Sequence, residues 1–233
     1  MAGLALIALL LQQPDFEPLY RQALQQREQA LGTNAAKTQQ SARDLALYLA
    51  GRGEYAKASP YREQALALAD TVEAATVLHN WAVAFEEQDA AKAEEMYRKA
   101  LAIREKMLPA ADVELATTRL NLAGLALRHD AGEALKLARA ALTVFDKKLG
   151  PMDVRTGVAC GTLGAALATR GDIAEAERMF RRALAVAEKA HGPKTLQTAD
   201  ALENLADLLA QTGRELAARP LLDRAKKIRA GSR

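Results

Sequence analysis

Residues 93–106 read AEEMYRKALAIREK, and residues 176–189 read AERMFRRALAVAEK. The two stretches are identical at nine of fourteen positions, and three of the other five are Tyr/Phe, Lys/Arg and Ile/Val exchanges. In both, apolar residues recur at helical spacing with charged residues between them. A phrase of this length that recurs within one chain predicts an array of similar helical units.

The Ala-Leu pair inside this phrase returns along the chain at a nearly constant interval. The successive markers are Ala23-Leu24, Ala65-Leu66, Ala100-Leu101, Ala141-Leu142, Ala183-Leu184 and Ala225-Lys226. Their spacings are 42, 35, 41, 42 and 42 residues, a period that biased composition alone would not maintain. Alanine and leucine dominate, and aromatic residues make up only 4%, which favours helices.

Each repeat contains two helical stretches joined by a short turn. In the clearest repeat, Gly171 ends the first helix and Asp172 is expected to cap the second. The second helix places Ala176, Phe180 and Ala183 on one face, so neighbouring helices approach closely at the alanines while the ring fills the gap. One hairpin cannot bury both of its faces alone, so successive hairpins are predicted to stack into a continuous core.

These positions resemble the tetratricopeptide repeat over about residues 15–231. The residues that carry the family pattern best are Leu163, Gly164, Leu167, Gly171, Ala176, Phe180 and Ala183. The usual repeat has about 34 residues, whereas intervals of 41–42 and phrases such as EKAHGP resemble the longer kinesin-light-chain type. The resemblance implies an all-α fold, a right-handed superhelical solenoid of antiparallel helix hairpins.

The expected organisation is an apolar N-terminal segment followed by one array of repeats. The array is predicted over residues 14–233, with a leading helix at 15–31 and helix pairs at 34–70, 72–108, 111–149, 153–191 and 194–230. Residues 1–13 read MAGLALIALLLQQ, which suits either the remnant of a secretory signal or a truncated first helix. The compartment therefore stays open between cytoplasmic and exported or periplasmic.

Charge and motif content argue against several function classes. The 32 basic and 29 acidic side chains nearly cancel, unlike those of a nucleic-acid binder. No apolar run reaches the roughly 20 residues that a membrane-spanning helix needs. Cys160 is expected to be a buried structural thiol. No phosphate loop, nucleophile motif or metal-ligand spacing is present, so we expect no enzyme, no cofactor and no metal.

The resemblance implies that first helices line a concave groove that binds a peptide or protein segment. One contact position of the family precedes the large apolar residue, and here it holds Asp44, Asn80, Asn121, Thr162 and Asn204. An asparagine amide offers a donor and an acceptor to an extended backbone, although it also suits a bond to a neighbouring helix or to water. The other predicted groove residues are Arg43, Thr76, His79, Val83, Glu87, Thr117, Leu120, Arg128 and Asp207.

A clamp for a C-terminal carboxylate, which the family builds from basic residues beside asparagine, is not expected. Only Arg43 and Arg128 qualify, and they lie in different repeats. The sequence thus predicts a non-catalytic scaffold whose partner is a protein or peptide and not a nucleic acid. The alternative is a structural or self-assembling module, because the apolar run Leu4–Leu11 would not cap the array; a homo-oligomer or a larger regulatory complex therefore stays open.

Overall fold

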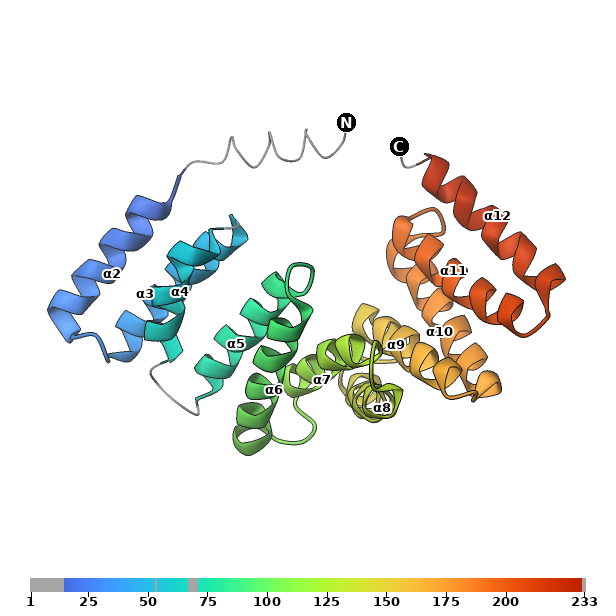
Figure 1. Cartoon of the computed structure of the whole chain (residues 1–233), viewed down its shortest axis with the longest axis horizontal. Coiled ribbons are helices and arrows are strands. Elements are labelled where there is room, and N and C mark those ends of the chain that lie inside the picture. Colours follow the sequence, from blue (N-terminus) through green and yellow to red (C-terminus); the bar gives the residue numbers. More distant parts are fainter. Residues whose placement is uncertain (1–14, 53, 67–70, 232–233) are drawn as a thin grey trace. The chain divides into compact units, whose positions relative to one another are not determined.

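The computed structural model describes residues 15–231 apart from residue 53 and residues 67–70. Within these residues every regular element is an α-helix, which confirms the expected all-α class (Figure 1). Residues 1–13, for which a signal remnant and a truncated helix were both left open, lie outside the described residues. The chain divides into two compact units, of which the first ends at Met96 and the second begins at Tyr97.

The first unit is built around α3. It contains α2 (Glu17–Leu31), α3 (Ala36–Gly51), α4 (Tyr55–Leu66), α5 (Val72–Phe85) and the start of α6 (Ala90–Met107). Helix α3 packs against α2, α4 and α5. Trp81 is buried and stacks on Phe85, with ring centroids 5.8 Å apart. Arg62 stands where the repeat pattern has an aromatic residue, and its guanidinium lies 5.2 Å from the Trp81 ring centroid, so a cation–π contact replaces a ring there.

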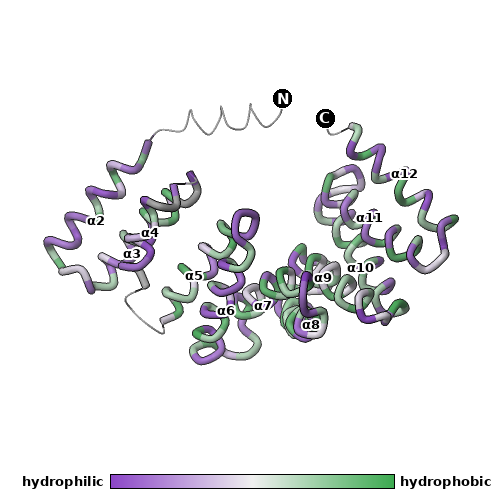
Figure 2. Tube along the Cα trace, in the orientation of Figure 1, coloured by the Kyte–Doolittle hydropathy of each residue, from purple (hydrophilic) through white to green (hydrophobic). Residues whose placement is uncertain are grey.

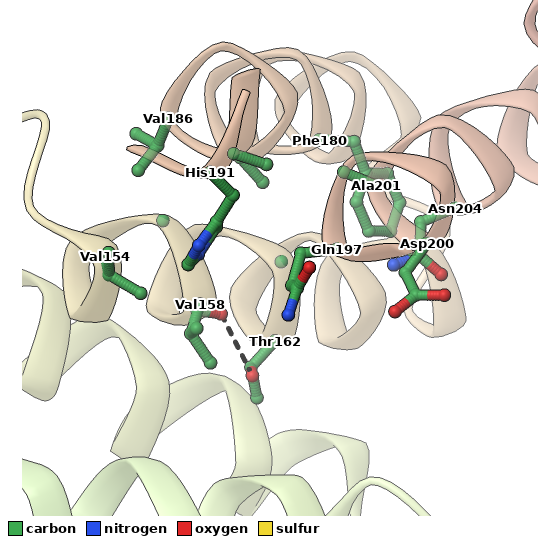
Figure 3. A pocket seen from close by; sticks show the side chains of 14 residues that line it. Val154, Val158, Thr162, Phe180, Val186, His191, Gln197, Asp200, Ala201 and Asn204 are labelled. Atoms are coloured by element: carbon green, nitrogen blue, oxygen red, sulfur yellow. Dashed lines mark hydrogen bonds between the residues drawn. The ribbon is translucent and has the colours of Figure 1, made fainter. Parts of the chain in front are cut away.

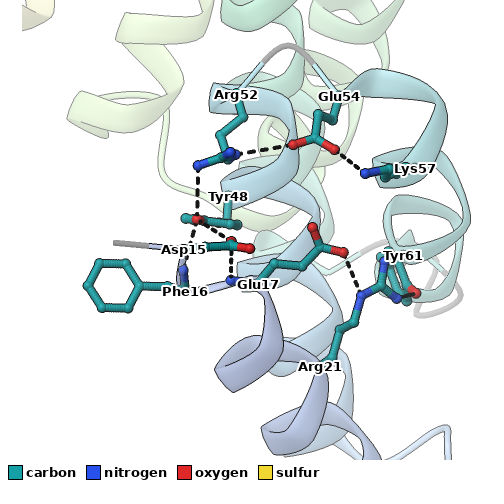
Figure 4. Close-up of polar contacts among 9 residues, drawn as sticks. All are labelled: Asp15, Phe16, Glu17, Arg21, Tyr48, Arg52, Glu54, Lys57 and Tyr61. Carbon is teal, nitrogen blue, oxygen red and sulfur yellow. Dashed lines mark hydrogen bonds and ion pairs between the residues drawn. The ribbon is translucent and has the colours of Figure 1, made fainter. Parts of the chain in front are cut away.

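Polar contacts at the surface join the start of α2 to the end of α3 (Figure 4). The Phe16 N–H donates to the Tyr48 hydroxyl at 3.0 Å, and that hydroxyl donates to Asp15 at 3.1 Å. Arg52 donates to Tyr48 at 3.4 Å and to Glu54 at 3.1 Å. These exposed bonds fix where α2 begins relative to α3, although each contributes little to stability by itself.

The second unit contains the end of α6 and three helix pairs. They are α7 (Val113–Ala126) with α8 (Ala131–Lys148), α9 (Val154–Thr169) with α10 (Ile173–His191), and α11 (Leu196–Gln211) with α12 (Glu215–Gly231). Side chains of Asp112, Asp153 and Thr195 accept N–H bonds at the starts of α7, α9 and α11.

The turn between α9 and α10 partly follows the sequence expectation. Gly171 has φ +85°, the left-handed conformation that favours glycine after a helix. Asp172 stands at the N-cap of α10, but its side chain accepts no capping hydrogen bond. Its carboxylate lies 4.0 Å from Arg170 instead, so the expected cap is replaced by a loose ion pair.

The first helices of the pairs are the more apolar ones, as the hydropathy colours show (Figure 2). Helix α9 contacts α7 and α8 on one side and α10 and α11 on the other. A helix enclosed in this way needs apolar residues around most of its circumference. Only a narrow stripe of α9 is left for solvent, and that stripe is the part of the helix that packing does not determine.

Two glycines of α9 allow close contact with α10. A Cβ atom added at Gly157 would lie 2.6 Å from Val186 Cγ1, and one at Gly164 would lie 2.9 Å from Phe180 Cδ1. Both distances are shorter than van der Waals contact, so a side chain there would force Val186 or Phe180, or the helices themselves, to shift. Gly161 lies between them in sequence but faces open space.

Gly157→Ala and Gly161→Ala are expected to change stability in opposite directions. The Gly157→Ala methyl group must displace Val186, which should lower the free energy of unfolding by about 1 kcal/mol. Gly161→Ala meets no atom and should raise it by up to about 1 kcal/mol through helix propensity. Urea denaturation followed by circular dichroism measures both. If both variants changed the free energy of unfolding in the same direction and by the same amount, the close packing of α9 on α10 would be contradicted.

In the second unit, ion pairs connect the second helix of one pair to the second helix of the next pair or to the turn before that helix. Their members are 35 to 37 residues apart in sequence, close to one repeat. The pairs are Arg98–Glu133 at 2.7 Å, Arg139–Glu175 at 2.9 Å, Arg214–Glu177 at 2.8 Å and Arg224–Glu188 at 2.5 Å. All are partly solvated, so each contributes at most about 1 kcal/mol, and the apolar first helices carry most of the packing.

Arg104 is a buried charge near the end of α6. Its side chain donates to the Glu114 carbonyl at 2.8 Å and to the Thr118 hydroxyl at 2.5 Å. Burial lowers the pKa of this guanidinium, while the carboxylates of Glu114 and Asp112 oppose the shift. In the next repeat the position four residues after the marker alanine holds Phe145, so Arg104 fills the space of an apolar core residue.

Arg104→Ala is expected to lower the free energy of unfolding by about 3 kcal/mol, because it leaves a cavity and removes two buried hydrogen bonds. Arg104→Met should cost less than about 1.5 kcal/mol, since methionine fills much of the volume. The Glu114 carbonyl also keeps its bond from Thr118 at 3.1 Å. Thermal and urea unfolding compare the two variants. Similar losses would show that hydrogen bonding and not volume determines the effect.

Candidate functional site

A trough of about 320 Å³ lies in the second unit between α9 and α11, and α10 also lines it (Figure 3). Helix α9 contributes Val154, Gly157, Val158, Gly161 and Thr162. Helix α10 contributes Phe180, Ala183, Val186, Ala187 and His191. Helix α11 contributes Gln197, Asp200, Ala201 and Asn204. Every lining residue belongs to the second unit, so the site is complete within it.

The α9 wall of the trough is apolar and exposed. Val154 is 41% exposed and Val158 is 53% exposed, although β-branched residues are poor helix formers on a solvated face. Gly161 adds no side chain beside them and faces open space, which leaves room above the helix. The charged side chain of α9, Arg155, lies 6.0 Å from the Phe145 ring centroid and does not line the trough. Exposed aliphatic residues gathered in a cavity are typical of a binding surface.

The α11 wall of the trough is polar. Gln197, Asp200 and Asn204 follow one another at spacings of three and four residues, and all three are exposed. In Figure 3, Asp200 and Asn204 stand at one side of the view and Val154 and Val186 at the other. The Asp200 carboxylate accepts from Arg229 of α12 at 2.5 Å. The trough therefore combines an aliphatic wall with amide and carboxylate groups opposite it.

A known repeat family matches the helices that form the trough. The family model of the tetratricopeptide repeat matches residues 157–230, which include most of the trough. Residues 157–230 carry tetratricopeptide repeats. The resemblance stated from the sequence is thereby confirmed. No curated protein sequence matches the chain.

Solved structures share the fold of these tetratricopeptide repeats. BtubC (BKLC) from P. vanneervenii is 21% identical, with a TM-score of 0.76 over 93% of this chain and 90% of that one. A kinesin-light-chain TPR-like repeat structure of Podosopora anserina is 19% identical, with a TM-score of 0.65 over 83% of this chain and 96% of that one. YrrB is 21% identical, with a TM-score of 0.62 over 88% of this chain and 92% of that one. At these identities the likeness shows the fold, a solenoid of tetratricopeptide-repeat hairpins, and the kinesin-light-chain likeness is one of fold.

The structure brings two sequence-predicted residues of the repeats, Thr162 and Asn204, into the trough. Asp207 is exposed on α11, one turn beyond Asn204 and on the same face. The Thr162 hydroxyl donates to the Val158 carbonyl at 3.2 Å, and its oxygen keeps acceptor capacity. The predicted position before the large apolar residue therefore does reach a cavity in these two repeats.

The predicted residues Asn121, Thr117, Leu120 and Arg128 of the second unit do not line the trough. The Asn121 amide donates to the Tyr97 hydroxyl at 3.1 Å, which is the bond to a neighbouring helix that the sequence analysis left open. Thr117 donates to the Val113 carbonyl at 2.8 Å, as Thr162 does to Val158. Leu120 is only 6% exposed and so offers little surface to a ligand. Arg128 is exposed in the turn after α7.

The predicted residues of the first unit differ in exposure. Asn80, Val83 and Glu87 are exposed, whereas His79 is only 7% exposed. Thr76 is half-buried and donates to the Val72 carbonyl at 2.9 Å. Arg43 and Asp44 are half-buried and lie 3.5 Å apart as an ion pair.

Sequence reasoning missed the two residues that make the trough apolar, Val154 and Val158. Val154, Val158 and Thr162 follow one another at intervals of four residues, so they share one face of α9. Because Thr162 was predicted to be a groove residue, the same spacing could have predicted that both valines face the groove. The sequence feature that could have revealed them is a pair of aliphatic residues on the solvent-facing side of a first helix. Ala183 of α10, which the sequence analysis treated as a packing residue, also lines the trough.

Few lining or adjacent groups have catalytic character. Burial raises the pKa of the Cys160 thiol to about 11, so this side chain of α9 is protonated at neutral pH. Among the described residues, no three or more His, Cys, Asp or Glu side chains gather where a metal ion could bind. In the same part of the chain, no helix is long and apolar enough to cross a membrane.

Asn121→Ala is expected to destabilise the protein by about 1 kcal/mol more than Asn204→Ala does, because only Asn121 loses a bond within the fold. Both changes gain the same helix propensity, which cancels in the comparison. Tyr97→Phe should remove most of that difference when combined with Asn121→Ala. Urea unfolding of the single and double variants measures the coupling. No coupling would show that the bond does not contribute to stability.

Proposed function

We propose that the chain is a non-catalytic scaffold that binds an extended peptide or protein segment in the trough between α9 and α11. The exposed aliphatic pair Val154 and Val158 beside a cavity of about 320 Å³ is the observation that carries this proposal. An aliphatic side chain of the partner would cover both valines, and burying such a side chain is worth about 1.5 kcal/mol or more.

The polar wall suits the backbone of such a segment. Gln197 and Asn204 each offer an amide donor and acceptor, and an extended backbone presents alternating N–H and C=O groups. YrrB, which shares the fold, is a TPR protein with an unusual peptide-binding site. Exposed residues predicted from the sequence, namely Asn80, Val83, Glu87, Arg128 and Asp207, are proposed as further contacts of the same kind, beside the half-buried pair Arg43 and Asp44.

The proposal separates binding from catalysis on chemical grounds. The α9 wall bears no titratable group in the trough, and the Asp200 carboxylate is already bonded to Arg229. Such a site can recognise a partner by shape and hydrogen bonds. The remaining titratable group of the trough is His191 of α10, and the proposal assigns no proton transfer to it.

Selection from a random-peptide library on the immobilised protein tests the proposal. For a selected peptide, Val158→Gln is expected to weaken binding about tenfold, because the aliphatic contact is lost. Asn204→Ala should weaken it about fivefold through one lost hydrogen bond. Leu216→Gln is the matched control, since Leu216 is 85% exposed on α12 and does not line the trough.

Fluorescence anisotropy of labelled peptides gives the affinities, and thermal unfolding confirms that each variant is folded. Peptides that bind Val158→Gln and Asn204→Ala as tightly as the unchanged protein would place recognition elsewhere. A library that yields no peptide would also count against the proposal.

A further inference from the structure

The two walls of the trough differ in charge. The lining residues of α9 carry none, whereas α11 bears Asp200, Glu203 and Asp207 and no cationic side chain. Asp200 and Asp207 are seven residues apart, which places them on one face of the helix, and Asn204 lies between them. Of these acids Asp200 lines the trough, and Asp207 lies farther along the same face of α11; the charged side chains of this helix are all carboxylates.

Neutralisation of these carboxylates is incomplete. Arg229 of α12 donates to Asp200 at 2.5 Å and to Glu203 at 2.6 Å, so one guanidinium serves two acids. Asp207 is exposed and forms no ion pair among the residues that the structure describes. Three carboxylates against one guanidinium leave a negative potential along the α11 wall.

We infer that the segment bound in the trough combines an aliphatic side chain with a neighbouring lysine or arginine. This inference rests on the proposed function and specifies its partner. The aliphatic side chain covers Val154 and Val158, and the cation lies toward Asp207 and the outer oxygen of Asp200. Opposite charge across an interface favours encounter and sets specificity more than it adds affinity.

An acidic segment or a free C-terminal carboxylate fits the trough poorly. Among the described residues neither lysine nor arginine lines it, and the titratable lining groups are Asp200 and His191. A carboxylate placed there would lose hydration, gain no guanidinium or ammonium partner, and face the α11 acids. The same charges that attract a basic segment therefore exclude an acidic one.

The composition of library-selected peptides is the first measurement. Lysine and arginine should be enriched next to an aliphatic residue, and aspartate and glutamate depleted. One selected peptide is then remade with its basic residues changed to glutamine or to glutamate, and the three forms are compared by anisotropy. The basic form should bind roughly tenfold tighter than the acidic form, and that preference should shrink as salt is raised, because exposed charges are screened.

Asp207→Asn identifies the carboxylate responsible. It should weaken the basic peptide roughly threefold and leave the glutamine form unchanged. Asp223→Asn is the matched control, because it removes the same charge from an exposed position on α12 and not from the face of α11 that carries Asp200 and Asn204. An equal effect of both variants would show only a long-range charge effect and would overturn the assignment to Asp207.

The failures of the two proposals are distinguishable. If all three peptide forms bind equally and Val158→Gln weakens each of them, the trough binds peptides but the charge preference is wrong. Enrichment of acidic residues among selected peptides would likewise overturn the preference alone. If binding is insensitive to Val158→Gln, the trough is not the site and both proposals fall.

Discussion

The close approach of a first helix to its partner is the constraint on which the second unit depends. Gly157 and Gly164 leave no room for a Cβ atom against Val186 and Phe180, so α9 lies directly on α10. Helix α9 also contacts α7, α8 and α11, so most of its circumference is buried and must be apolar. These contacts also determine which residues of α9 remain outside the packing. The trough exists because Val154, Val158 and Thr162 lie on that remaining stripe.

Residues on the solvent-facing stripe of a first helix can change for binding without disrupting the packing of the fold. On α9 this stripe is aliphatic, and on α11 it is made of amides and carboxylates. Neither choice is what stability alone would favour, since exposed valine and asparagine are poor helix formers. The side chains of the ion pairs between second helices are half-buried or exposed, so these pairs contribute little to stability. The contrast between the two walls is thus the most informative chemical feature of the second unit.

Much of the fold could be predicted from sequence, because small residues recur at a fixed interval and glycines mark the turns. The residues that line the trough were predicted less completely. The position rule for first helices brought Thr162 and Asn204 to the trough, yet at the same position Asn121 donates to Tyr97. Equivalent positions in different repeats face different neighbours, and a rule based on spacing does not distinguish an amide that meets a hydroxyl from one that meets solvent. His79 and Leu120 were predicted to line a groove and are buried for the same reason.

The sequence by itself determined the helical class, the repeat and the residues that let helices touch, since these depend on local propensity and on a period set by stacking. Only the tertiary structure decided that Val154 and Val158 border a cavity, that Arg104 replaces an apolar residue in the core, and that Asp207 forms no ion pair within the described part of the chain. Those facts depend on which side chains from separate helices meet. The separation of two residues along the chain does not give the distance between their side chains in space. These contacts are therefore known only from the packed hairpins.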